Sequence, residues 1–321
     1  MSETIVETVD LKKYFPIRGG ILLRQVAAIH AVDRVSLFVI RGETLGLVGE
    51  SGCGKTTLSR LIMRLIKPTS GTIRYMGRDL LKIDKREMQK TRMEMAMIFQ
   101  NPYGSLNPRM TVADIVGEPL TVHGLAKGKD KKKRIVELMK KVGLAPHHLY
   151  RYPHEFSGGQ KQRIGIARAL ACSPKLLVAD EPVSSLDVSV RAQILNVLKA
   201  LKKEFGFTSI YVSHDLSTVR QMVDRVAVMY VGKIVELAPV KDIYAEPRHP
   251  YTQALMSAIP IPGKQRKDRI VLKGSVPTPI DPPPGCRFNP RCLYSEPECA
   301  EQDPELAEVR TGHFVACHLK R

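Results

Sequence analysis

The sequence predicts an α/β protein built on a parallel β-sheet, and three apolar runs support this prediction. They are Leu45–Val48, Leu176–Ala179 and the start of the segment FTSIYVSHDL, which leads to His214. The second run is apolar throughout, as expected of a strand buried on both faces of a parallel sheet. Stretches with apolar residues at helical spacing separate these runs, as in alternating α/β folds.

The size and composition of the chain are those of a globular protein. It has 321 residues, of which 43% are hydrophobic and 26% charged. This length suggests one large domain with an appendage, or two domains of moderate size. The opening MSETIVETVD lacks the basic patch and apolar core of a signal peptide. No stretch approaches the roughly 20 apolar residues that cross a bilayer, so we expect membrane association only through partners or surface contact.

The chain carries a formal charge of +18, which is compatible with a polyanionic partner but does not by itself decide the partner. Nucleic acid, the anionic cytoplasmic leaflet and nucleotide phosphates all fit this charge. The densest basic run, KGKDKKKRIVELMKKVG from Lys127, continues into apolar residues at helical spacing: Ile135, Leu138, Met139 and Val142. We interpret the run as the solvated start of an amphipathic helix.

The segment after the first strand has the pattern of a phosphate-binding loop. Gly49, Gly54, Lys55 and Thr56 fit G-x-x-x-x-G-K-[ST], the Walker A motif. A helix is expected next, from the spacing of Leu58, Leu61, Ile62 and Leu65. We predict that the nucleotide phosphates contact residues of this segment: Gly49, Glu50, Ser51, Gly52, Cys53, Gly54, Lys55, Thr56 and Thr57.

Each residue type in the loop has a physical role. The glycines let backbone N–H groups surround phosphate oxygens, and the helix N-terminus adds the positive end of its dipole. Lys55 is expected to reach the β- and γ-phosphates, and the Thr56 hydroxyl to ligate Mg²⁺. Cys53 occupies a variable position and is expected to be a small filler rather than a reactive thiol.

Two further strands are expected to bring acidic and imidazole groups to the same site. Asp180 and Glu181 follow the run Leu176–Ala179, at the carboxyl end where open α/β sheets bind ligands. Asp180 is predicted to hold Mg²⁺, and Glu181 to orient the attacking water. His214 is predicted to contact the γ-phosphate.

A second glycine-rich helix start lies in HEFSGGQKQRIGIARALA. Ser157 is a natural N-cap, and Gly158 and Gly159 leave the following N–H groups exposed to an anion. The helix has an apolar face formed by Ile164, Ala167, Leu170 and Ala171. Two phosphate cradles are consistent with two such domains that pair head to tail, each completing the other's nucleotide site.

These motifs together resemble the ATP-binding-cassette family over about residues 5 to 240. FSGGQ is similar to the family signature, with Phe156 where leucine is commoner. Gln100 in MIFQNPYGSLNP resembles the Q-loop glutamine, SSLD up to Asp187 the D-loop, and His214 the switch histidine. The resemblance implies a P-loop fold of the family type, with a RecA-like core and antiparallel β and α-helical subdomains.

The resemblance also implies roles for individual residues. Glu181, His214 and Gln100 would be catalytic, with Gln100 joining Thr56 and Asp180 at Mg²⁺. An aromatic side chain near the N-terminus would stack on adenine: Phe15, or Tyr14 as the alternative. The remaining nucleotide contacts would come from the signature and D-loop, namely Ser157, Gly158, Gly159, Gln160 and Asp187.

The C-terminal third resembles one branch of this family. RHPYTQALMSAIP and the proline-rich GSVPTPIDPPPGC follow the cassette. This order is similar to the ATPase subunits of oligopeptide/dipeptide and nickel importers, and LKKYFPI near the start resembles the second of their two ATPases. We therefore expect a nucleotide-binding domain over 1–240, with its helical subdomain at about 101–170, and a C-terminal module over 241–321.

Four cysteines, spaced C-x5-C-x6-C-x17-C, lie in this C-terminal extension: Cys286, Cys292, Cys299 and Cys317. Four thiolates suit zinc or an iron–sulfur cluster, and the spacing alone leaves unligated thiols open as well. The resemblance implies a [4Fe–4S] cluster, with zinc as the alternative. His313 and His318 flank Cys317 and could replace a thiol as a ligand, but we expect them at the surface.

The importer resemblance implies a set of partners. These are a paralogous ATPase in a heterodimer, two transmembrane permease subunits and an extracytoplasmic substrate-binding protein, with the chain peripheral on the cytoplasmic face of the membrane. The function implied is ATP hydrolysis that powers peptide uptake, without direct nucleic-acid contact. The alternative is a repair-type cassette ATPase with a zinc module, but such proteins carry paired C-x-x-C spacings that this sequence lacks.

Overall fold

The computed structural model describes residues 3–19, 24–259, 270–280, 282 and 284–320. The chain divides into two compact units, and each is described by itself. The first contains residues 1–3, 40–42 and 82–212, and the second contains residues 4–39, 43–81 and 213–321. Among the described residues, no helix combines the length and apolar character needed to cross a membrane.

The first unit joins three parallel strands to a group of helices. The strands β6 (Met95–Ile98), β7 (Leu176–Asp180) and β8 (Thr208–Ser213) pair in the order β8-β7-β6. Every residue of β7 and β8 is buried, which confirms the expected parallel strands. The helices are α2 (Lys85–Glu94), α3 (Pro102–Ser105), α4 (Val112–Val122), α5 (Gly128–Lys141), α6 (Gly158–Leu170) and α7 (Val188–Phe205), with 3-10 turns at Pro146–Tyr150 and Pro153–Glu155.

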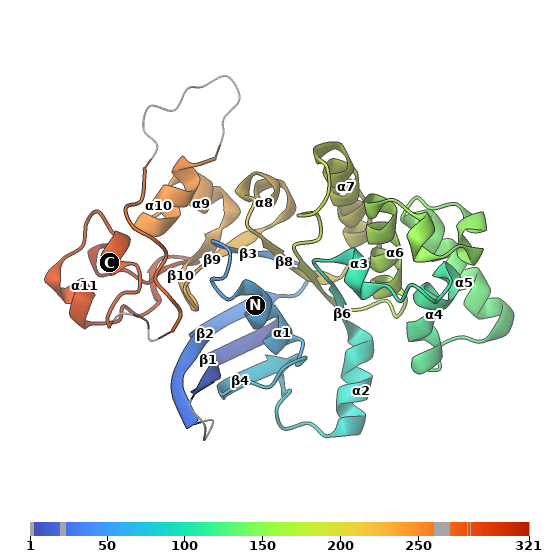
Figure 1. Ribbon diagram of the computed structural model, residues 1–321, viewed down its shortest axis with the longest axis horizontal. Coiled ribbons are helices and arrows are strands. Elements are labelled where there is room, and N and C mark those ends of the chain that lie inside the picture. The colour runs from blue at the N-terminus through green and yellow to red at the C-terminus, as the bar shows by residue number, and fades with distance from the viewer. Residues whose placement is uncertain (1–2, 20–23, 260–269, 281, 283, 321) are drawn as a thin grey trace. The chain divides into compact units, whose positions relative to one another are not determined.

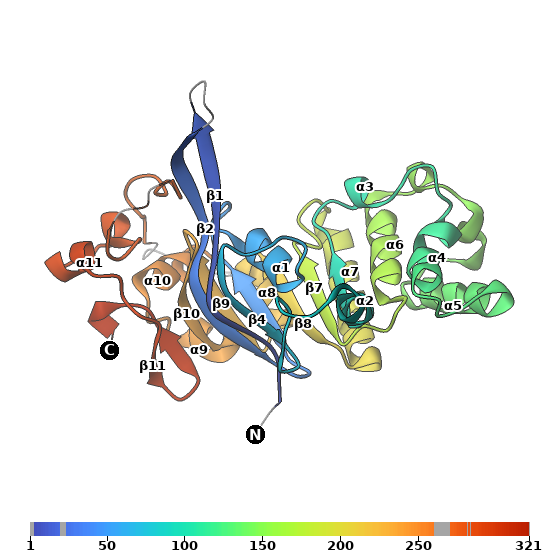
Figure 2. The ribbon, with the colours of Figure 1, turned by 90° about the horizontal axis from the view of Figure 1, so that it is seen from below.

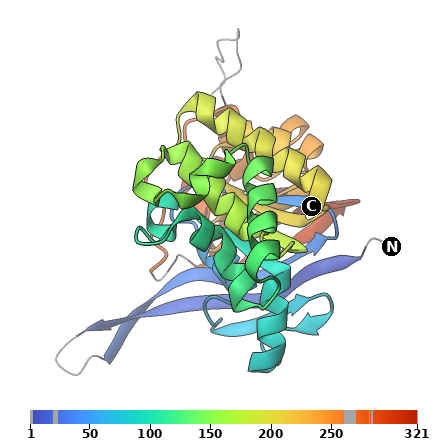
Figure 3. The ribbon, with the colours of Figure 1, turned by 90° about the vertical axis from the view of Figure 1, so that its right-hand side faces the viewer.

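Helices α4, α5 and α6 pack on one another and appear in green in Figure 3. The predicted amphipathic helix is α5: Ile135, Leu138 and Met139 are at most 4% exposed, whereas most of its basic N-terminal run is exposed. Lys131 and Arg134 are half-buried exceptions. The run is therefore largely a solvated helix start, as predicted.

The second unit contains an antiparallel sheet with two long strands. The strands β1 (Thr4–Gly19), β2 (Arg24–Ile40), β4 (Ser70–Tyr75) and β5 (Arg78–Asp79) lie in the order β2-β1-β4-β5. The pairs β1–β4 and β4–β5 are antiparallel. Figure 2 shows β1 and β2, in blue, as a long twisted ribbon.

A second group of strands in this unit supports the phosphate loop. The strand β3 (Thr44–Val48) pairs in parallel with β9 (Arg225–Tyr230), and β10 (Lys233–Pro239), β12 (His313–Val315) and β11 (Ala307–Arg310) follow in antiparallel order. The strands β12 and β11 thus extend the sheet beyond β10. Figure 1 labels β10 together with α10 and α11 of the same C-terminal region. The helices are α1 (Lys55–Ile62), α8 (Leu216–Met222), α9 (Val240–Ala245), α10 (Pro250–Ser257) and α11 (Pro297–Glu301), with 3-10 turns at Asn289–Arg291 and His318–Lys320.

The helix after the phosphate loop is shorter than its apolar spacing suggested. Leu58, Leu61 and Ile62 are at most 1% exposed, but α1 ends at Ile62 and Leu65 is 43% exposed. The extension of the helical face to Leu65 was therefore wrong. The chain turns at Arg64, which has a left-handed φ of 48° that no helix interior accommodates.

Candidate nucleotide-binding site

The loop between β3 and α1 has a conformation that requires glycine at two positions. Gly49 has a φ of 151° and Gly54 a φ of 109°. A Cβ atom on Gly49 would lie 2.1 Å from the Met229 carbonyl oxygen, and one on Gly54 would lie 2.1 Å from the Ala31 carbonyl oxygen. Both contacts are with backbone and cannot relax by a rotamer change. The glycines of the motif are therefore needed for the fold of the loop as well as for access to a ligand.

Lys55 lies along the inside of this loop. Its Nζ donates hydrogen bonds to the carbonyl oxygens of Gly49 at 2.7 Å and Glu50 at 2.8 Å, and the residue is 5% exposed. Ser51 and Gly52, at the crown of the loop, are exposed, and Thr56 and Thr57 are half-buried in the first turn of α1. The loop thus curls around its own ammonium group, with its crown open to solvent.

Cys53 packs under the loop as a small buried residue. It is 4% exposed, and its Sγ lies 3.6 Å from Lys55 Nζ. Burial raises the pKa of the Cys53 thiol, although the neighbouring ammonium opposes the shift. A neutral thiol is a weak nucleophile, so this environment agrees with the predicted filler role.

The structure brings together two of the predicted catalytic residues in the first unit. Gln100 Nε2 donates to Glu181 Oε2 at 2.9 Å. Glu181 has a left-handed φ of 45°, and its N–H donates to the Val212 carbonyl oxygen at the end of β8. Asp180, the last residue of β7, is 2% exposed. The turn after β7 therefore holds the Glu181 carboxylate beside the Gln100 amide, a pairing that the sequence did not suggest.

Two further predicted site residues, Asp187 and His214, are exposed to solvent. Asp187 is the exposed N-cap residue of α7, without a side-chain capping bond. His214 belongs to the second unit, directly follows the last residue of β8 in the chain, and is exposed. Both side chains are thus accessible to a ligand.

The signature helix begins with a reciprocal cap. Ser157 Oγ accepts a hydrogen bond from the Gln160 N–H at 3.3 Å, and Gln160 Oε1 accepts one from the Ser157 N–H at 3.0 Å. A Cβ on Gly159 would lie 2.4 Å from Cγ1 of Val190 in α7, so a larger residue there requires the Val190 side chain to shift. The buried apolar face of α6 is the predicted one: Ile164, Ala167, Leu170 and Ala171 are 0% exposed.

The two candidate adenine-stacking residues differ in their surroundings. The Tyr14 ring stacks on His30 with centroids 4.0 Å apart, and its hydroxyl donates to Asp33 Oδ1 at 2.5 Å. Burial and this bond raise the pKa of Tyr14 to about 12. Phe15 is 38% exposed, with Lys13 Nζ 4.9 Å from its ring centroid. Tyr14 is therefore engaged within its unit, whereas the Phe15 ring faces solvent.

Two residues that contact the phosphate loop were not predicted from the sequence. Tyr251, in α10, accepts a hydrogen bond at its hydroxyl from the Glu50 N–H at 2.9 Å. Arg291 forms an ion pair with the Glu50 carboxylate, at 3.0 Å from Nη1 to Oε2. The segments HPYT and NPRC were visible in the sequence, but nothing local linked them to a loop about 200 residues away.

The four C-terminal cysteines gather in one region without forming a ligand group. Burial raises the pKa of Cys286 to about 11, with Cys299 and Cys317 close enough to contribute, and Cys292 is similarly influenced by Cys299. Over the described part of the chain, however, no three His, Cys, Asp or Glu side chains are placed to hold a metal ion. The geometry therefore does not support the predicted iron–sulfur or zinc site.

We expected His313 and His318 at the surface, but the side chains of both are largely buried. His313 is 1% exposed, and its Nε2 lies 2.7 Å from Oε1 of Glu236, which is itself fully buried. The His318 side chain is 5% exposed and lies 3.4 Å from Glu298. The placement was wrong because β12 pairs with β10 and carries His313 into the core.

Comparison with known proteins places the chain in a family. Residues 32–184 match the model of the ABC transporter family, and residues 235–299 match the oligopeptide/dipeptide transporter C-terminal region. The chain is 50% identical to the oligopeptide transport ATP-binding protein AppF of Bacillus subtilis, over 99% of this chain and 98% of that protein. It is 48% identical to the oligopeptide transport ATP-binding protein OppF of Salmonella typhimurium, over 98% and 96% of the two chains.

Solved structures agree with this assignment. A dimeric post-hydrolysis ATP-binding cassette bound to ADP and Pi matches with a TM-score of 0.66 and 30% identity, covering 74% of this chain and 99% of that one. A dimeric bacterial ABC transporter cassette matches with a TM-score of 0.65 and 29% identity, over 74% and 99% of the two chains. The chain therefore belongs to the ABC transporter ATP-binding proteins, in the group that carries the oligopeptide/dipeptide transporter C-terminal region.

Proposed function

We propose that this protein is the ATP-hydrolysing subunit of an importer that takes up oligopeptides or dipeptides. One observation carries the proposal: an ABC transporter match, which includes the Walker A motif and the strand that ends at Asp180, and an oligopeptide/dipeptide C-terminal region occur on the same chain. Relatives at 50% and 48% identity over almost their whole length are oligopeptide transport ATP-binding proteins.

The residues divide the chemistry of hydrolysis between them. The Walker A loop binds the phosphates through its N–H groups and Lys55, which must release its bonds to Gly49 and Glu50 to reach a ligand. Glu181 orients the attacking water and accepts its proton, while Gln100 holds the carboxylate in place. His214 contacts the γ-phosphate.

The oxygen donors fit the magnesium ion that accompanies ATP. Thr56 supplies a hydroxyl, Asp180 a buried carboxylate and Gln100 an amide oxygen, and Mg²⁺ prefers such oxygen ligands. When bound, the ion neutralises charge that develops on the phosphates. Asp180, the last residue of β7, and Thr56, in the first turn of α1, would hold the ion.

The finer organisation follows the same proposal. Two cassettes pair head to tail, so that the capped start of α6 in one cassette binds the γ-phosphate held by the Walker A loop of the other. Asp187 lies where the two cassettes meet. Phe15 stacks on the adenine of the bound nucleotide. The partner ATPase is a paralogue of this chain. Of the two paralogous ATPases of such importers, this chain corresponds to the second. The assembly includes two permease subunits and a substrate-binding protein, and the cassette lies peripherally on the cytoplasmic side. The cassette ends near residue 240, with its helical subdomain at about 101–170.

A metal cluster at the C-terminal cysteines is a separate, narrower proposal. It rests on the importer resemblance, because the described side chains do not form a ligand group. No step of hydrolysis involves it. Iron, sulfide and zinc analysis of anaerobically purified protein distinguishes a [4Fe–4S] cluster, zinc and free thiols.

Reconstituted transport tests the main proposal. The chain, its permease subunits, its partner ATPase and its binding protein are placed in liposomes, and ATP-dependent uptake of labelled peptides is measured. Glu181→Gln is expected to retain nucleotide binding while hydrolysis and uptake fall by roughly 10²–10⁴-fold, the usual contribution of a general base. Near-normal hydrolysis in this variant would contradict the role of Glu181. Salt-sensitive DNA binding without peptide uptake would contradict the proposed function.

A further inference from the structure

The Walker A loop carries an acidic residue at a position where a polyphosphate must bind. Glu50 directly follows Gly49 and is half-buried, and its carbonyl oxygen is one of the two that hold Lys55. An unpaired carboxylate in this loop would repel the phosphates of ATP, because like charges at short range raise the free energy of binding. The loop therefore needs a compensating cation close to Glu50.

Arg291 supplies that cation from the C-terminal extension. Its Nη1 lies 3.0 Å from Oε2 of Glu50, and its Nη2 lies 3.4 Å from Oε1, so the guanidinium faces both carboxylate oxygens. Arg291 is 8% exposed. Burial would lower the pKa of Arg291, but hydrogen bonds to Glu50 and Tyr230 raise it, so the side chain stays charged. Paired forks of this kind are among the stronger charge-assisted bonds.

A cluster of aromatic side chains contacts both Arg291 and the Walker A loop. Tyr230 and Tyr251 have ring centroids 4.5 Å apart, and Phe288 packs against both at 5.3 and 5.5 Å. The Tyr230 hydroxyl lies 3.4 Å from Arg291 Nη1, and the Tyr251 hydroxyl accepts from the Glu50 N–H. The backbone and the carboxylate of Glu50 are therefore each held by a different element of the extension, α10 and the 3-10 turn at Asn289–Arg291.

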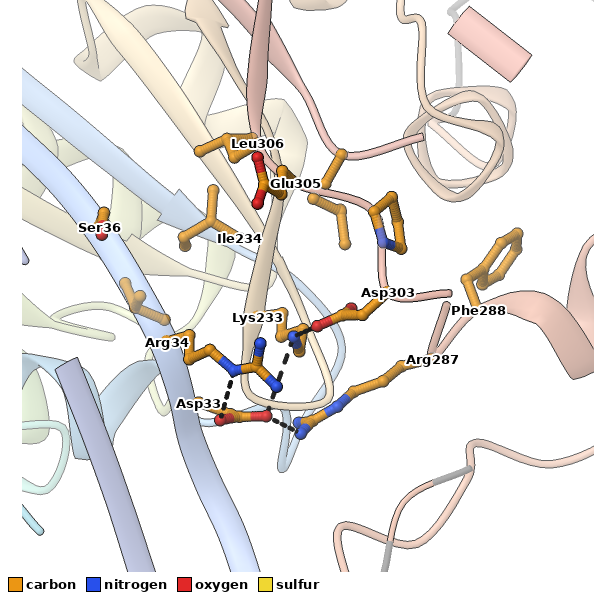
Figure 4. Close-up of a pocket in the computed structure, with 14 residues that line it drawn as sticks. Asp33, Arg34, Ser36, Lys233, Ile234, Arg287, Phe288, Asp303, Glu305 and Leu306 are labelled. Carbon is orange, nitrogen blue, oxygen red and sulfur yellow. Dashed lines mark hydrogen bonds and ion pairs between the residues drawn. The ribbon is translucent and has the colours of Figure 1, made fainter. Parts of the chain in front are cut away.

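A second arginine of the same segment reaches the N-terminal sheet. Arg287 forms a buried ion pair with Asp33 and donates to the carbonyl oxygen of Val231. Asp33 in turn accepts from the Tyr14 hydroxyl. Figure 4 shows Arg287 beside Asp33 at a cavity of about 280 Å³, where Lys233 also pairs with Asp303. Two arginines four positions apart thus anchor the segment Cys286–Cys292 to both the sheet and the phosphate loop.

We propose that Arg291 is a positioning residue for ATP: it neutralises Glu50 and, with Tyr251, holds the Walker A loop in its binding conformation. The cysteine-bearing extension thereby acts on nucleotide affinity. The proposal rests on the proposed ATPase function, and it assigns to the extension a role in the nucleotide site of its own chain.

Nucleotide titration of the full chain tests this proposal. Arg291→Met is expected to raise the Kd for a fluorescent ATP analogue about tenfold, or about 1.4 kcal/mol. The loss should be smaller for ADP, because ADP carries less negative charge. Glu50→Gln added to Arg291→Met should restore most of the affinity, since it removes the uncompensated carboxylate. A purely structural role of Arg291 predicts no such rescue and no dependence on nucleotide charge.

The control variant is Arg310→Met. Arg310 pairs with Asp242 at 2.9 Å in the same extension without contacting the Walker A loop, and its side chain is 50% exposed. Its Kd should equal that of the parent protein. An Arg291→Met variant with the parent's Kd, or a double variant no better than the single one, overturns the proposal and leaves ATP hydrolysis standing. A parent protein that binds no ATP contradicts the ATPase function as well, so the two failures are distinguishable.

Discussion

Gly54 shows how much the nucleotide site depends on a single residue. Its φ of 109° lies in the region that side chains rarely adopt, and a Cβ would lie 2.1 Å from the Ala31 carbonyl oxygen. The carbonyl belongs to the backbone of β2, so the strain cannot be relieved by moving a side chain. The loop would have to move away from β2, and its N–H groups would then lose their alignment toward a ligand.

Gly54→Ala is therefore expected to destabilise the fold by about 1–3 kcal/mol, the usual cost of a strained backbone position, and to weaken ATP binding at least tenfold. Thermal unfolding and nucleotide titration measure the two effects. Gly52→Ala is the matched control, since Gly52 also has a positive φ of 80° but nothing lies within 4 Å of its Cβ. Equal losses in the two variants would show that backbone strain alone, and not the Ala31 contact, sets the cost.

In the head-to-tail pairing that we propose, helix α6 links local stability to the contact between two cassettes. The reciprocal bonds between Ser157 and Gln160 satisfy two N–H groups at its start. The Lys161 N–H donates to the Ser157 carbonyl oxygen, so the N–H groups left for an anion are those of Gly158 and Gly159, and the buried face of the helix fixes their direction. The cap therefore serves both the helix and the ligand that we propose it binds.

Ser157→Ala is expected to cost about 1 kcal/mol of stability, the typical loss of an N-cap, and also to weaken ATP-driven dimerisation. Size-exclusion chromatography with ATP in the Glu181→Gln background measures the second effect. Thr111→Ala is the matched control, because Thr111 caps α4 by accepting from the Asp114 N–H at 3.2 Å. It should lose similar stability yet dimerise normally. Equal loss of dimerisation in both would place the effect in general stability.

A buried ion pair joins distant parts of the chain within the second unit. Asp33 and Arg287 are 5% and 6% exposed and are separated by 254 positions. Burial would raise the pKa of Asp33, but the Tyr14 hydroxyl and the Arg287 guanidinium lower it overall. Because the folded pKa lies below the ordinary value of 3.8, the carboxylate stabilises the fold fully above pH 3.8 and loses this contribution as the pH falls further.

Arg287→Met is expected to lower stability by about 3–5 kcal/mol at neutral pH, because it leaves a buried carboxylate without its partner. Adding Asp33→Asn should recover part of this loss, since it removes that charge. The parent protein should lose stability below about pH 4 more steeply than the double variant does. Thermal unfolding across pH measures both effects, and a single variant as stable as Arg310→Met would contradict the buried pair.

The sequence by itself determined the local parts of the site. The Walker A glycines, the Ser157 cap, the strand that ends at Asp180 and the apolar face of α5 all depend on residues within a few positions of one another. Backbone preferences and side-chain periodicity act over the same short range, so the pattern of residue types was sufficient. The end of α1 was misjudged because the position of a helix end depends on a turn residue such as Arg64, which the spacing of leucines does not reveal.

Only the tertiary structure decided which distant groups meet. The Arg291–Glu50 pair spans 241 positions, the Tyr251 hydroxyl reaches the loop across 201, and His313 is carried into the core by the pairing of β12 with β10. The charges and aromatic rings were all visible in the sequence, but many exposed partners were equally available to each. Which partner a buried charge finds depends on how the chain closes on itself, because burial removes the water that would otherwise satisfy it.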